Sequence, residues 1–452
     1  MARKYFIETF GCQMNHHDSE RLAGLLEAEG YEPGLDETTS DLVVVNTCSV
    51  REKAEEKLYS RLGEIRQAAR EAGTRPILAV AGCVAQQEGE KLLKRGADID
   101  VVVGTQSMKR LPALVEQARE EGRRRIDIHP YEDVSFPLGM VRHSDPVRAW
   151  VTIIEGCNEF CAFCVVPYTR GHERMRPVVD ILAEVELAAS TGRREVQLLG
   201  QIVNHYQAPD DPSCDFAGLL ERVSQVPGVE RIRFASPHPR YVTQRLIEAI
   251  RDIPAVCKHL HLPLQSGSSR ILAAMRRRHT RQYYLELVDQ VRNAVPTIAL
   301  STDLIVGFPG ETDADFADTM SVVRAVDFHA IYSFKYSPRP NTLALKRMPD
   351  DVSESVKTTR IMALQALQRD LQIARFTRAI GTVEMVLVDS VSRRRGDELA
   401  GRTESNIVVN FAGPADWIGR LVPIRFTAAA PNSVRGEAVG ECALAGSRES
   451  SC

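Results

Sequence analysis

Three closely spaced cysteines are the residues of this chain best suited to metal chemistry. Cys157, Cys161 and Cys164 stand in the stretch EGCNEFCAFC, with the spacing C-x-x-x-C-x-x-C. A structural zinc site or a closed iron-sulfur cluster takes four protein ligands. Three thiolates can instead hold three irons of a [4Fe-4S] cluster. The fourth iron then stays open to an external ligand, such as the amine and carboxylate of an α-amino acid.

The alternative for this stretch is an incomplete zinc knuckle, for which His172 is the one further ligand nearby. The cysteines directly follow a strand-like run, RAWVTIIEGC. A strand that leads into a cysteine-bearing loop favours the iron-sulfur interpretation.

A second set of cysteines is spread along the first part of the chain. Cys12, Cys48 and Cys83 each end a strand-like run and lie about one βα unit apart. The carboxyl ends of parallel strands emerge at one edge of a sheet, so we expect these thiols to meet and to form a second cluster site. Gly11 and Gly82 precede two of them, where the backbone can pass close to a bulky ligand. The alternative is three small buried side chains, since free cysteine is often buried.

The elements that position these thiols follow from the hydrophobic pattern. Within the first 130 or so residues, the strand-like runs KYFIETFGC, DLVVVNTCSV, PILAVAGCV and DIDVVVGT alternate with helix-like segments. This alternation predicts a doubly wound parallel α/β domain. Six further strand-like runs alternate with helices between about 147 and 338, which predicts a (β/α)6 partial barrel.

A third region follows a long helical stretch over 353–381. Short strands separated by turns predict a small β-barrel of about 65 residues, similar to an OB fold. Arg393, Arg394, Arg395 and Arg402 give it a basic surface suited to phosphates, and a solvated run of charges is the alternative.

Composition limits the functional class. The chain has 452 residues, a net charge of -3 and 44% apolar residues, which is enough for real cores. With about 150 residues per domain as a guide, we expect two to four domains. No apolar run approaches the roughly 20 residues of a membrane helix, and the first residues lack the pattern of a signal peptide. We therefore expect a cytoplasmic protein, in which cysteines serve as metal ligands or reactive thiols rather than disulfides. The remaining cysteines, Cys214, Cys257, Cys442 and Cys452, show no ligand spacing.

The motifs together resemble a known family. The cysteine stretch, with aromatic Phe163 before its last cysteine, is the signature of the radical S-adenosylmethionine superfamily. ETFGCQMNHHDSE, AVAGCVAQQ, GCNEFCAFCVVPYTRGHERMRP, LPLQSGS and DLIVGFPGET resemble the tRNA methylthiotransferases over nearly the whole chain. These enzymes convert N6-isopentenyladenosine at position 37 of tRNA, beside the anticodon, into its 2-methylthio derivative. GQIVNHY departs from the family's GQNVNSY.

The resemblance implies the cofactors and the role of each triad. Cys157, Cys161 and Cys164 would hold a [4Fe-4S] cluster that cleaves S-adenosylmethionine to a radical. Cys12, Cys48 and Cys83 would hold an auxiliary [4Fe-4S] cluster that carries the sulfur. The cofactors supply the difficult chemistry and the protein aligns them. Residues at the carboxyl ends of barrel strands would contact S-adenosylmethionine: Gly200, Gln201, Ser236, Gln265 and Gly307, with Phe163 in the cysteine loop. Core packing of Phe163 and ordinary turns at the other positions are the alternatives.

The resemblance also implies partners and domain limits. We expect a methylthiotransferase domain over 1–130, a radical S-adenosylmethionine domain over 143–376 and a TRAM RNA-binding domain over 377–443. The expected partners are the tRNA anticodon stem-loop with isopentenyladenosine and an electron donor such as a flavodoxin or ferredoxin. We expect no membrane contact and a monomer.

Two other functions fit parts of the pattern. One is the sister branch of enzymes that methylthiolate an aspartate of a ribosomal protein. The other is a non-catalytic iron-sulfur carrier or RNA-binding sensor, which needs neither a whole barrel nor an aromatic residue inside its cysteine motif.

Overall fold

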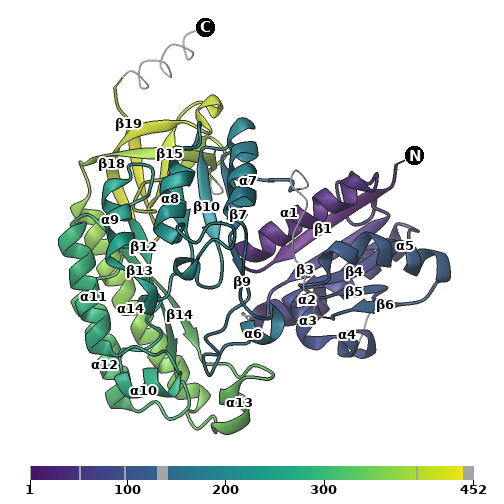
Figure 1. Ribbon diagram of the computed structural model, residues 1–452, viewed down its shortest axis with the longest axis horizontal. Helices are drawn as coiled ribbons and strands as arrows, with labels where there is room; N and C mark the ends of the chain where they lie inside the picture. The colour runs from purple at the N-terminus through teal and green to yellow at the C-terminus, as the bar shows by residue number, and fades with distance from the viewer. Residues whose placement is uncertain (1, 50–51, 96–97, 130–140, 393–394, 441–452) are drawn as a thin grey trace.

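The chain forms three successive domains, seen in a computed structural model that describes residues 2–49, 52–95, 98–129, 141–392 and 395–440. Figure 1 shows an N-terminal lobe in purple and blue, a central domain in teal and green, and a small yellow barrel at the C-terminal end. Within the described ranges, no helix is both long and apolar enough to cross a membrane.

The N-terminal domain is built on a parallel sheet with the strand order β2-β1-β3-β4-β5-β6. Its strands are β1 (Lys4–Phe10), β2 (Glu32–Pro33), β3 (Leu42–Thr47), β4 (Ile77–Gly82), β5 (Val101–Val103) and β6 (Arg125–Asp127). Its helices are α1 (Gln13–Ala28), α2 (Glu52–Glu71), α3 (Cys83–Glu88), α4 (Glu90–Arg95) and α5 (Leu111–Glu121). The short strands β2 and β6 were not among the strands predicted from the sequence.

Both faces of this sheet are covered, which confirms the doubly wound arrangement. Val44 packs in a core with residues of α1 and α5, whereas Val43 and Val45 pack in a second core with residues of α2 and α3. Successive residues of a strand point to opposite faces, so a continuous valine run is buried on both sides.

The central domain is the predicted partial barrel, with parallel strands in two groups. One group has the order β11-β10-β7 and the other β12-β13-β14. A parallel bridge between Ile232 and Val256 joins β11 to the segment that leads into β12. The strands are β7 (Arg148–Thr152), β10 (Glu195–Leu199), β11 (Arg231–Phe234), β12 (His259–His261), β13 (Ala299–Val306) and β14 (Ala330–Lys335). A two-stranded antiparallel pair, β8 (Ile154–Glu155) and β9 (Arg174–Met175), follows β7.

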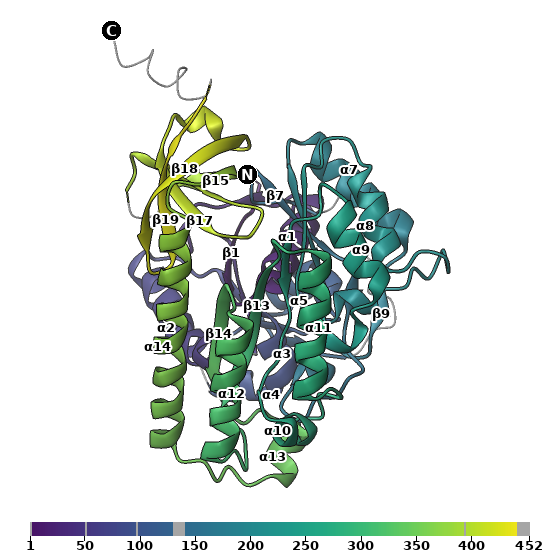
Figure 2. The same cartoon turned by 90° about the vertical axis from the view of Figure 1, so that its left-hand side faces the viewer.

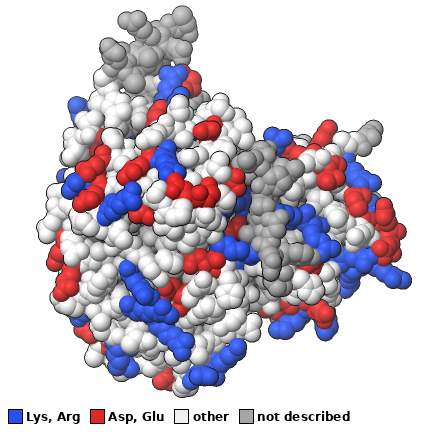
Figure 3. All heavy atoms as spheres, viewed as in Figure 1, with Lys and Arg blue, Asp and Glu red and all other residues white. Residues whose placement is uncertain are grey.

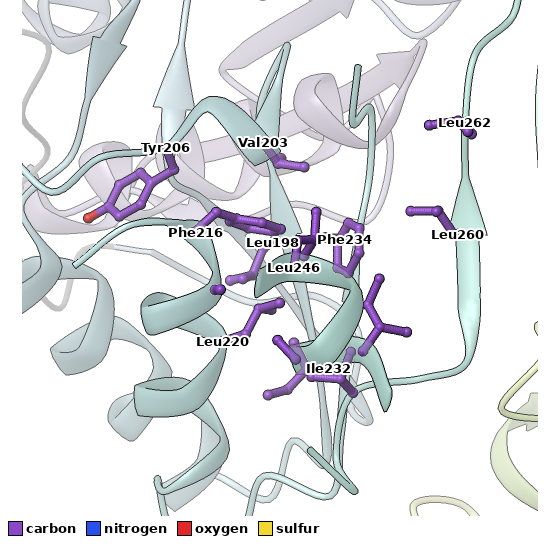
Figure 4. Close-up of a cluster of buried hydrophobic side chains, with 14 of the residues drawn as sticks. Leu198, Val203, Tyr206, Phe216, Leu220, Ile232, Phe234, Leu246, Leu260 and Leu262 are labelled. Atoms are coloured by element: carbon purple, nitrogen blue, oxygen red, sulfur yellow. The ribbon is translucent and has the colours of Figure 1, made fainter. Parts of the chain in front are cut away.

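Helices cover the outer face of these strands. They are α7 (Val178–Ser190), α8 (Phe216–Ser224), α9 (Gln244–Asp252), α10 (Ser269–Ala274), α11 (Arg281–Ala294), α12 (Asp313–Val326) and α14 (Glu354–Arg378). The short helices α6 (Val166–Thr169) and α13 (Leu343–Arg347) lie outside this outer layer. Figure 4 shows Leu198, Ile232 and Phe234 of the strands packed among helix residues such as Phe216 and Leu246. The apolar strand positions therefore face outward, toward the helices.

The C-terminal domain is a closed barrel with the order β15-β16-β17-β19-β18. Its strands are β15 (Val383–Val391), β16 (Glu398–Arg402), β17 (Val408–Ala412), β18 (Leu421–Ala430) and β19 (Ser433–Ala438). Phe376, near the end of α14, is buried in the core of this barrel. Figure 2 shows α14 as a long helix that leads from the central domain into the barrel.

Buried arginines attach the C-terminal barrel to the amino ends of the central strands. Arg231, the first residue of β11, donates to the carbonyl oxygens of Arg402 (2.5 Å) and Met385 (2.8 Å). Arg233 donates to the carbonyl of Thr403 at 2.6 Å. The barrel thus docks on the edge opposite to the carboxyl ends, where ligands are held in such folds.

Glu195 anchors this arginine group. Its carboxylate accepts from Arg148 Nε at 2.7 Å and from Arg233 Nε at 2.9 Å. Burial opposes ionisation of Glu195, but the two guanidinium groups outweigh it and lower its pKa to about 2.

Candidate active site

The structure brings Cys12, Cys48 and Cys83 to one edge of the N-terminal sheet. Phe10 of β1 pairs with Thr47 of β3, which pairs with Gly82 of β4, and the cysteines follow these strand ends. Cys12 precedes α1, and Cys83 is the first residue of α3.

Tight backbone packing holds this edge together. Gly11 has φ +149°, and a Cβ there would lie 2.6 Å from Cβ of Cys48. Gly82 has φ +91°, and a Cβ there would lie 2.2 Å from Oδ1 of Asn46. The close neighbours of both glycines are therefore protein atoms, whereas the sequence suggested a bulky ligand as the reason for the glycines.

The three thiols share one electrostatic environment. A hydrogen bond with Cys48 lowers the pKa of Cys12 to about 6, whereas burial raises the pKa of Cys83. Arg170 lies close to both, lowering the pKa of each thiol by its charge. This buried arginine also contacts the Cys83 side chain and donates to Asp18 at 2.6 Å. Three convergent thiols with a buried cation suit an anionic, thiolate-bound cluster.

The second triad lies in the loop after β8. Cys157 N–H donates to the Gly171 carbonyl at 3.2 Å, and Cys164 N–H donates to that of Cys161 at 3.0 Å. Arg277 Nη1 donates to Cys161 Sγ at 3.5 Å. Burial raises the pKa of Cys157 to about 11 and, together with the charges of Cys161 and Cys157, that of Cys164 to about 12. Thiols with raised pKa values lose their protons when a metal binds them.

Neither triad has the geometry of a site for a single metal ion. Among the described residues, no group of three His, Cys, Asp or Glu side chains is arranged to hold one ion.

Helix α1 carries the connection between the two triads. His17 is fully buried and contacts Thr152 Oγ1 at 2.6 Å and Glu184 Oε1 at 3.2 Å. One turn later, Arg21 donates to Glu155 at 2.5 Å, two residues before Cys157. The polar residues of α1 are thus buried against the central domain, which fixes one triad relative to the other.

Helix α6 and Arg170, which follow Cys164, make the reciprocal contacts. Thr105 Oγ1 donates to the Thr169 carbonyl at 2.5 Å, and Gln106 Nε2 donates to the Arg170 carbonyl at 3.0 Å. These bonds hold the segment that delivers Arg170 to the N-terminal triad.

The expected S-adenosylmethionine contacts lie at or after strand ends. Gly200 and Gln201 follow β10, Ser236 follows β11, and Gly307 follows β13. Ser236 (φ 61°) and Gln265 (φ 75°) adopt left-handed backbone conformations that are uncommon outside glycine and concentrate at functional sites. Buried Oε1 of Gln201 has no hydrogen-bond partner among the described residues.

Two of these expected contacts also have structural roles. Phe163 is partly buried and packs edge-on against Phe308 with ring centroids 6.5 Å apart. Gly307 has φ +73°, and a Cβ there would lie 2.3 Å from Cγ of Lys357.

The expected RNA-binding arginines are in different settings. Arg393 and Arg394 lie outside the described residues. Arg395 is exposed and lies 3.5 Å from Glu398, whereas Arg402 contacts Asp389 and Asn406 near the docked face of the barrel.

Arg170, Asp18 and Arg277 were not identified as site residues from the sequence. Arg170 and Asp18 lie inside the motifs YTRGHERMRP and NHHDSE, and the sequence places them far apart. Spacing within a motif does not reveal a contact between domains.

Comparisons with known proteins match this architecture domain by domain. Residues 4–104 match the uncharacterized protein family UPF0004, residues 151–323 the radical SAM superfamily, and residues 377–439 the TRAM domain. The chain is similar to tRNA-2-methylthio-N(6)-dimethylallyladenosine synthases of Thiobacillus denitrificans and Geobacter metallireducens. The first is 48% identical and the match covers 97% of this chain and 98% of the relative. The second is 47% identical, with coverage of 96% and 97%.

Among solved structures, the fold is similar to the radical S-adenosylmethionine methyltransferase TsrM from Kitasatospora setae, with cobalamin and a [4Fe-4S] cluster bound. That match has a TM-score of 0.55 and 17% identity, and it covers 76% of this chain and 77% of that one.

Proposed function

Because the chain belongs to the family of tRNA-2-methylthio-N(6)-dimethylallyladenosine synthases, we propose that it converts N6-isopentenyladenosine at position 37 of tRNA into its 2-methylthio derivative. The supporting observation is the convergence of two separate cysteine triads across one domain interface, with α1 bonded between them. The family assignment makes this enzyme a radical S-adenosylmethionine methylthiotransferase.

Each triad has its own role in this proposal. Cys157, Cys161 and Cys164 hold one [4Fe-4S] cluster, and Cys12, Cys48 and Cys83 hold a second. When bound, S-adenosylmethionine and the two clusters supply a carbon-centred radical and the sulfur that is inserted.

The chain's own residues orient and shield these groups. Arg277 donates toward Cys161 and Arg170 toward Cys83, so each triad has a positive partner that favours thiolate over thiol. Phe163, Gly200, Gln201, Ser236, Gln265 and Gly307 remain the residues proposed to contact S-adenosylmethionine. Ser236 and Gln265 adopt left-handed backbone conformations although they are not glycine, and such conformations concentrate at functional sites.

The partners follow from the same proposal. The TRAM domain supports binding of tRNA, with Arg393, Arg394, Arg395 and Arg402 as the phosphate contacts. We propose the domain limits 1–130, 143–376 and 377–443, a cytoplasmic monomer, and an electron donor of the flavodoxin or ferredoxin type.

The experiment that tests the function is a choice between two substrates. Anaerobically reconstituted protein is given an isopentenylated anticodon stem-loop or a ribosomal protein with its methylthiolated aspartate unmodified, and the products are analysed by mass spectrometry. We expect the 2-methylthio nucleoside and no modified protein. The opposite result would place the chain in the branch that modifies ribosomal protein.

A further inference from the structure

The six strands of the partial barrel carry two different sets of side chains. Alternate residues of a strand point to opposite faces. One set, such as Val196, Leu198 and Leu304, packs against the helices on the outer face. The other set therefore faces inward, where the two strand groups confront each other in a barrel.

The inner positions midway along the strands are polar or aromatic, unlike those of a packed barrel. The interior of a closed (β/α)8 barrel is filled mainly by Val, Ile and Leu. Here the inner positions midway along five strands form what we call the inner-face group: Trp150, Gln197, His261, Asp303, Tyr332 and Phe334. Such residues do not serve to fill a core.

Two local pairings order the inner-face group. Trp150 Nε1 donates to Gln197 Oε1 at 3.2 Å across β7 and β10. On the other side, His261 Nε2 lies 3.3 Å from Asp303 Oδ2, and its ring meets that of Tyr332 edge-on at 5.7 Å. Hydrogen bonds and ring contacts thus hold these side chains in place before any ligand binds.

Two aromatic rings of the group stay open to solvent. Tyr332 is 51% exposed and Phe334 is 39% exposed, although both belong to a strand within the barrel. They lie two residues apart on β14, and Tyr332 is the direct neighbour of Asp303 on β13. A flat ligand can therefore stack on an aromatic face while a carboxylate reaches its edge.

Trp150 links the inner-face group to both triads. The ring of His16 stacks on Trp150 at 5.6 Å, and His16 is four residues after Cys12. Thr152, the next inner position after Trp150, contacts His17. The strand that carries Trp150 and Thr152 leads through β8 to Cys157.

The charges of this region fit a base better than a phosphate. Arg148 of β7 and Arg233 of β11 are already paired with Glu195. Asp303 adds a negative charge that repels phosphate. A substituted adenine suits the group, because its faces stack, its remaining N6–H can donate to a carboxylate, and its alkyl substituent is apolar.

We propose that the inner-face group binds the target adenine of the tRNA, with Tyr332 and Phe334 stacking on the base and Asp303 accepting from its N6–H. This inference rests on the proposed function and deepens it, because it names the residues that recognise the base. In this arrangement the TRAM domain contacts the tRNA phosphates, and the inner-face group recognises the base.

The test compares variants of the holoenzyme with a matched control. Tyr332→Ala and Asp303→Asn should each raise the KM for isopentenylated stem-loop by about tenfold or more, as the loss of base stacking or of a hydrogen bond to a charged group predicts. Tyr332→Phe keeps the aromatic ring, so its KM should stay close to that of the wild type. Ser333→Ala alters the neighbouring residue on the outer face, where it contacts Gln365, and should change nothing.

A binding measurement separates this effect from chemistry. A stem-loop with fluorescent 2-aminopurine in place of the target base should be quenched by wild-type protein and by Tyr332→Phe, but much less by Tyr332→Ala. The iron content and RNA-free cleavage of S-adenosylmethionine should stay unchanged in every variant.

The outcomes distinguish the two claims. A wild-type protein that makes no methylthio nucleoside would refute the proposed function. An active wild type whose Tyr332→Ala and Asp303→Asn variants keep the KM, and whose Tyr332→Ala variant still quenches 2-aminopurine, would refute the inference alone. Loss of iron in both variants would also overturn it, since the residues would then be structural.

Discussion

Arg170 of the central domain donates to Asp18 of the N-terminal domain at 2.6 Å, and both side chains are buried. The same guanidinium contacts the Cys83 side chain and acts electrostatically on Cys12. One arginine that follows Cys157, Cys161 and Cys164 in the sequence therefore contacts the other triad in space.

We expect Arg170→Gln to impair the N-terminal cluster specifically. Removing the cation leaves Asp18 buried without its charge partner, a loss of about 3–5 kcal/mol. It should also shift the midpoint potential of that cluster to more negative values, because a nearby positive charge stabilises the reduced form. This shift is measured by electron paramagnetic resonance during redox titration of a variant that lacks Cys157, Cys161 and Cys164. The control is Arg378→Gln, at a side chain that is 70% exposed.

Replacing Cys157, Cys161 and Cys164 together by alanine should lower the iron content of reconstituted protein from about eight to about four atoms per chain. Iron and sulfide assays measure the change. Full retention of iron would show that this triad holds no cluster.

Replacing Cys12, Cys48 and Cys83 by alanine should abolish the methylthio product while cleavage of S-adenosylmethionine to 5'-deoxyadenosine continues. The other triad, which includes Cys161, lies on the central domain and keeps its contact with Arg277. Liquid chromatography of both products in one reaction gives the answer. Cys214→Ala, at a buried cysteine of the central domain, is the control, and methylthiolation by the triple variant would reduce the strand-end cysteines to core residues.

Replacing Arg393, Arg394 and Arg395 by alanine should weaken the binding of all tRNAs alike and flatten its salt dependence. Phosphate contacts release counterions without reading bases. Titrations at several salt concentrations measure the slope, with Arg420→Ala as the control at an exposed arginine paired to Asp416. Unchanged tRNA affinity would show that these three arginines are only a solvated run of charges.

The attachment of the C-terminal barrel should depend on the ionisation of Glu195. Its pKa is lowered to about 2 in the folded chain, so its contribution is complete above the ordinary glutamate pKa and is lost as the pH falls toward 2. Glu195→Gln leaves buried Arg233 without its carboxylate partner, whereas Arg148 keeps Asp389, and it should lower stability by about 3–5 kcal/mol at neutral pH. Urea unfolding at pH 7 and pH 4 tests both statements. An equal loss of stability on acidification in the wild type and the variant would contradict them.

The sequence predicted the parts of the fold that depend on local pattern. Continuous apolar runs such as Leu42–Thr47 identified strands buried on both faces. Parallel order alone was enough to predict that Cys12, Cys48 and Cys83 meet at one edge. The strands β2 and β6 were missed because two or three residues are too few to carry a periodic signal.

Contacts between domains could not be predicted in the same way. The partnership of Arg170 with Asp18 joins residues 152 positions apart, and no spacing rule connects them. The same limit applies to Arg231, whose partners Met385 and Arg402 belong to another domain. The inner-face group needed the strand register, which fixes which alternate residues share a face.

The buried polar face of α1 bears on how the chain is made. During translation the N-terminal domain leaves the ribosome before its partner, so His17, Asp18 and Arg21 meet water before they meet Thr152, Arg170 and Glu155. Because these side chains are hydrophilic, the waiting nascent domain presents a surface that does not promote aggregation. The residues that later align the two triads thus also keep the unfinished protein soluble.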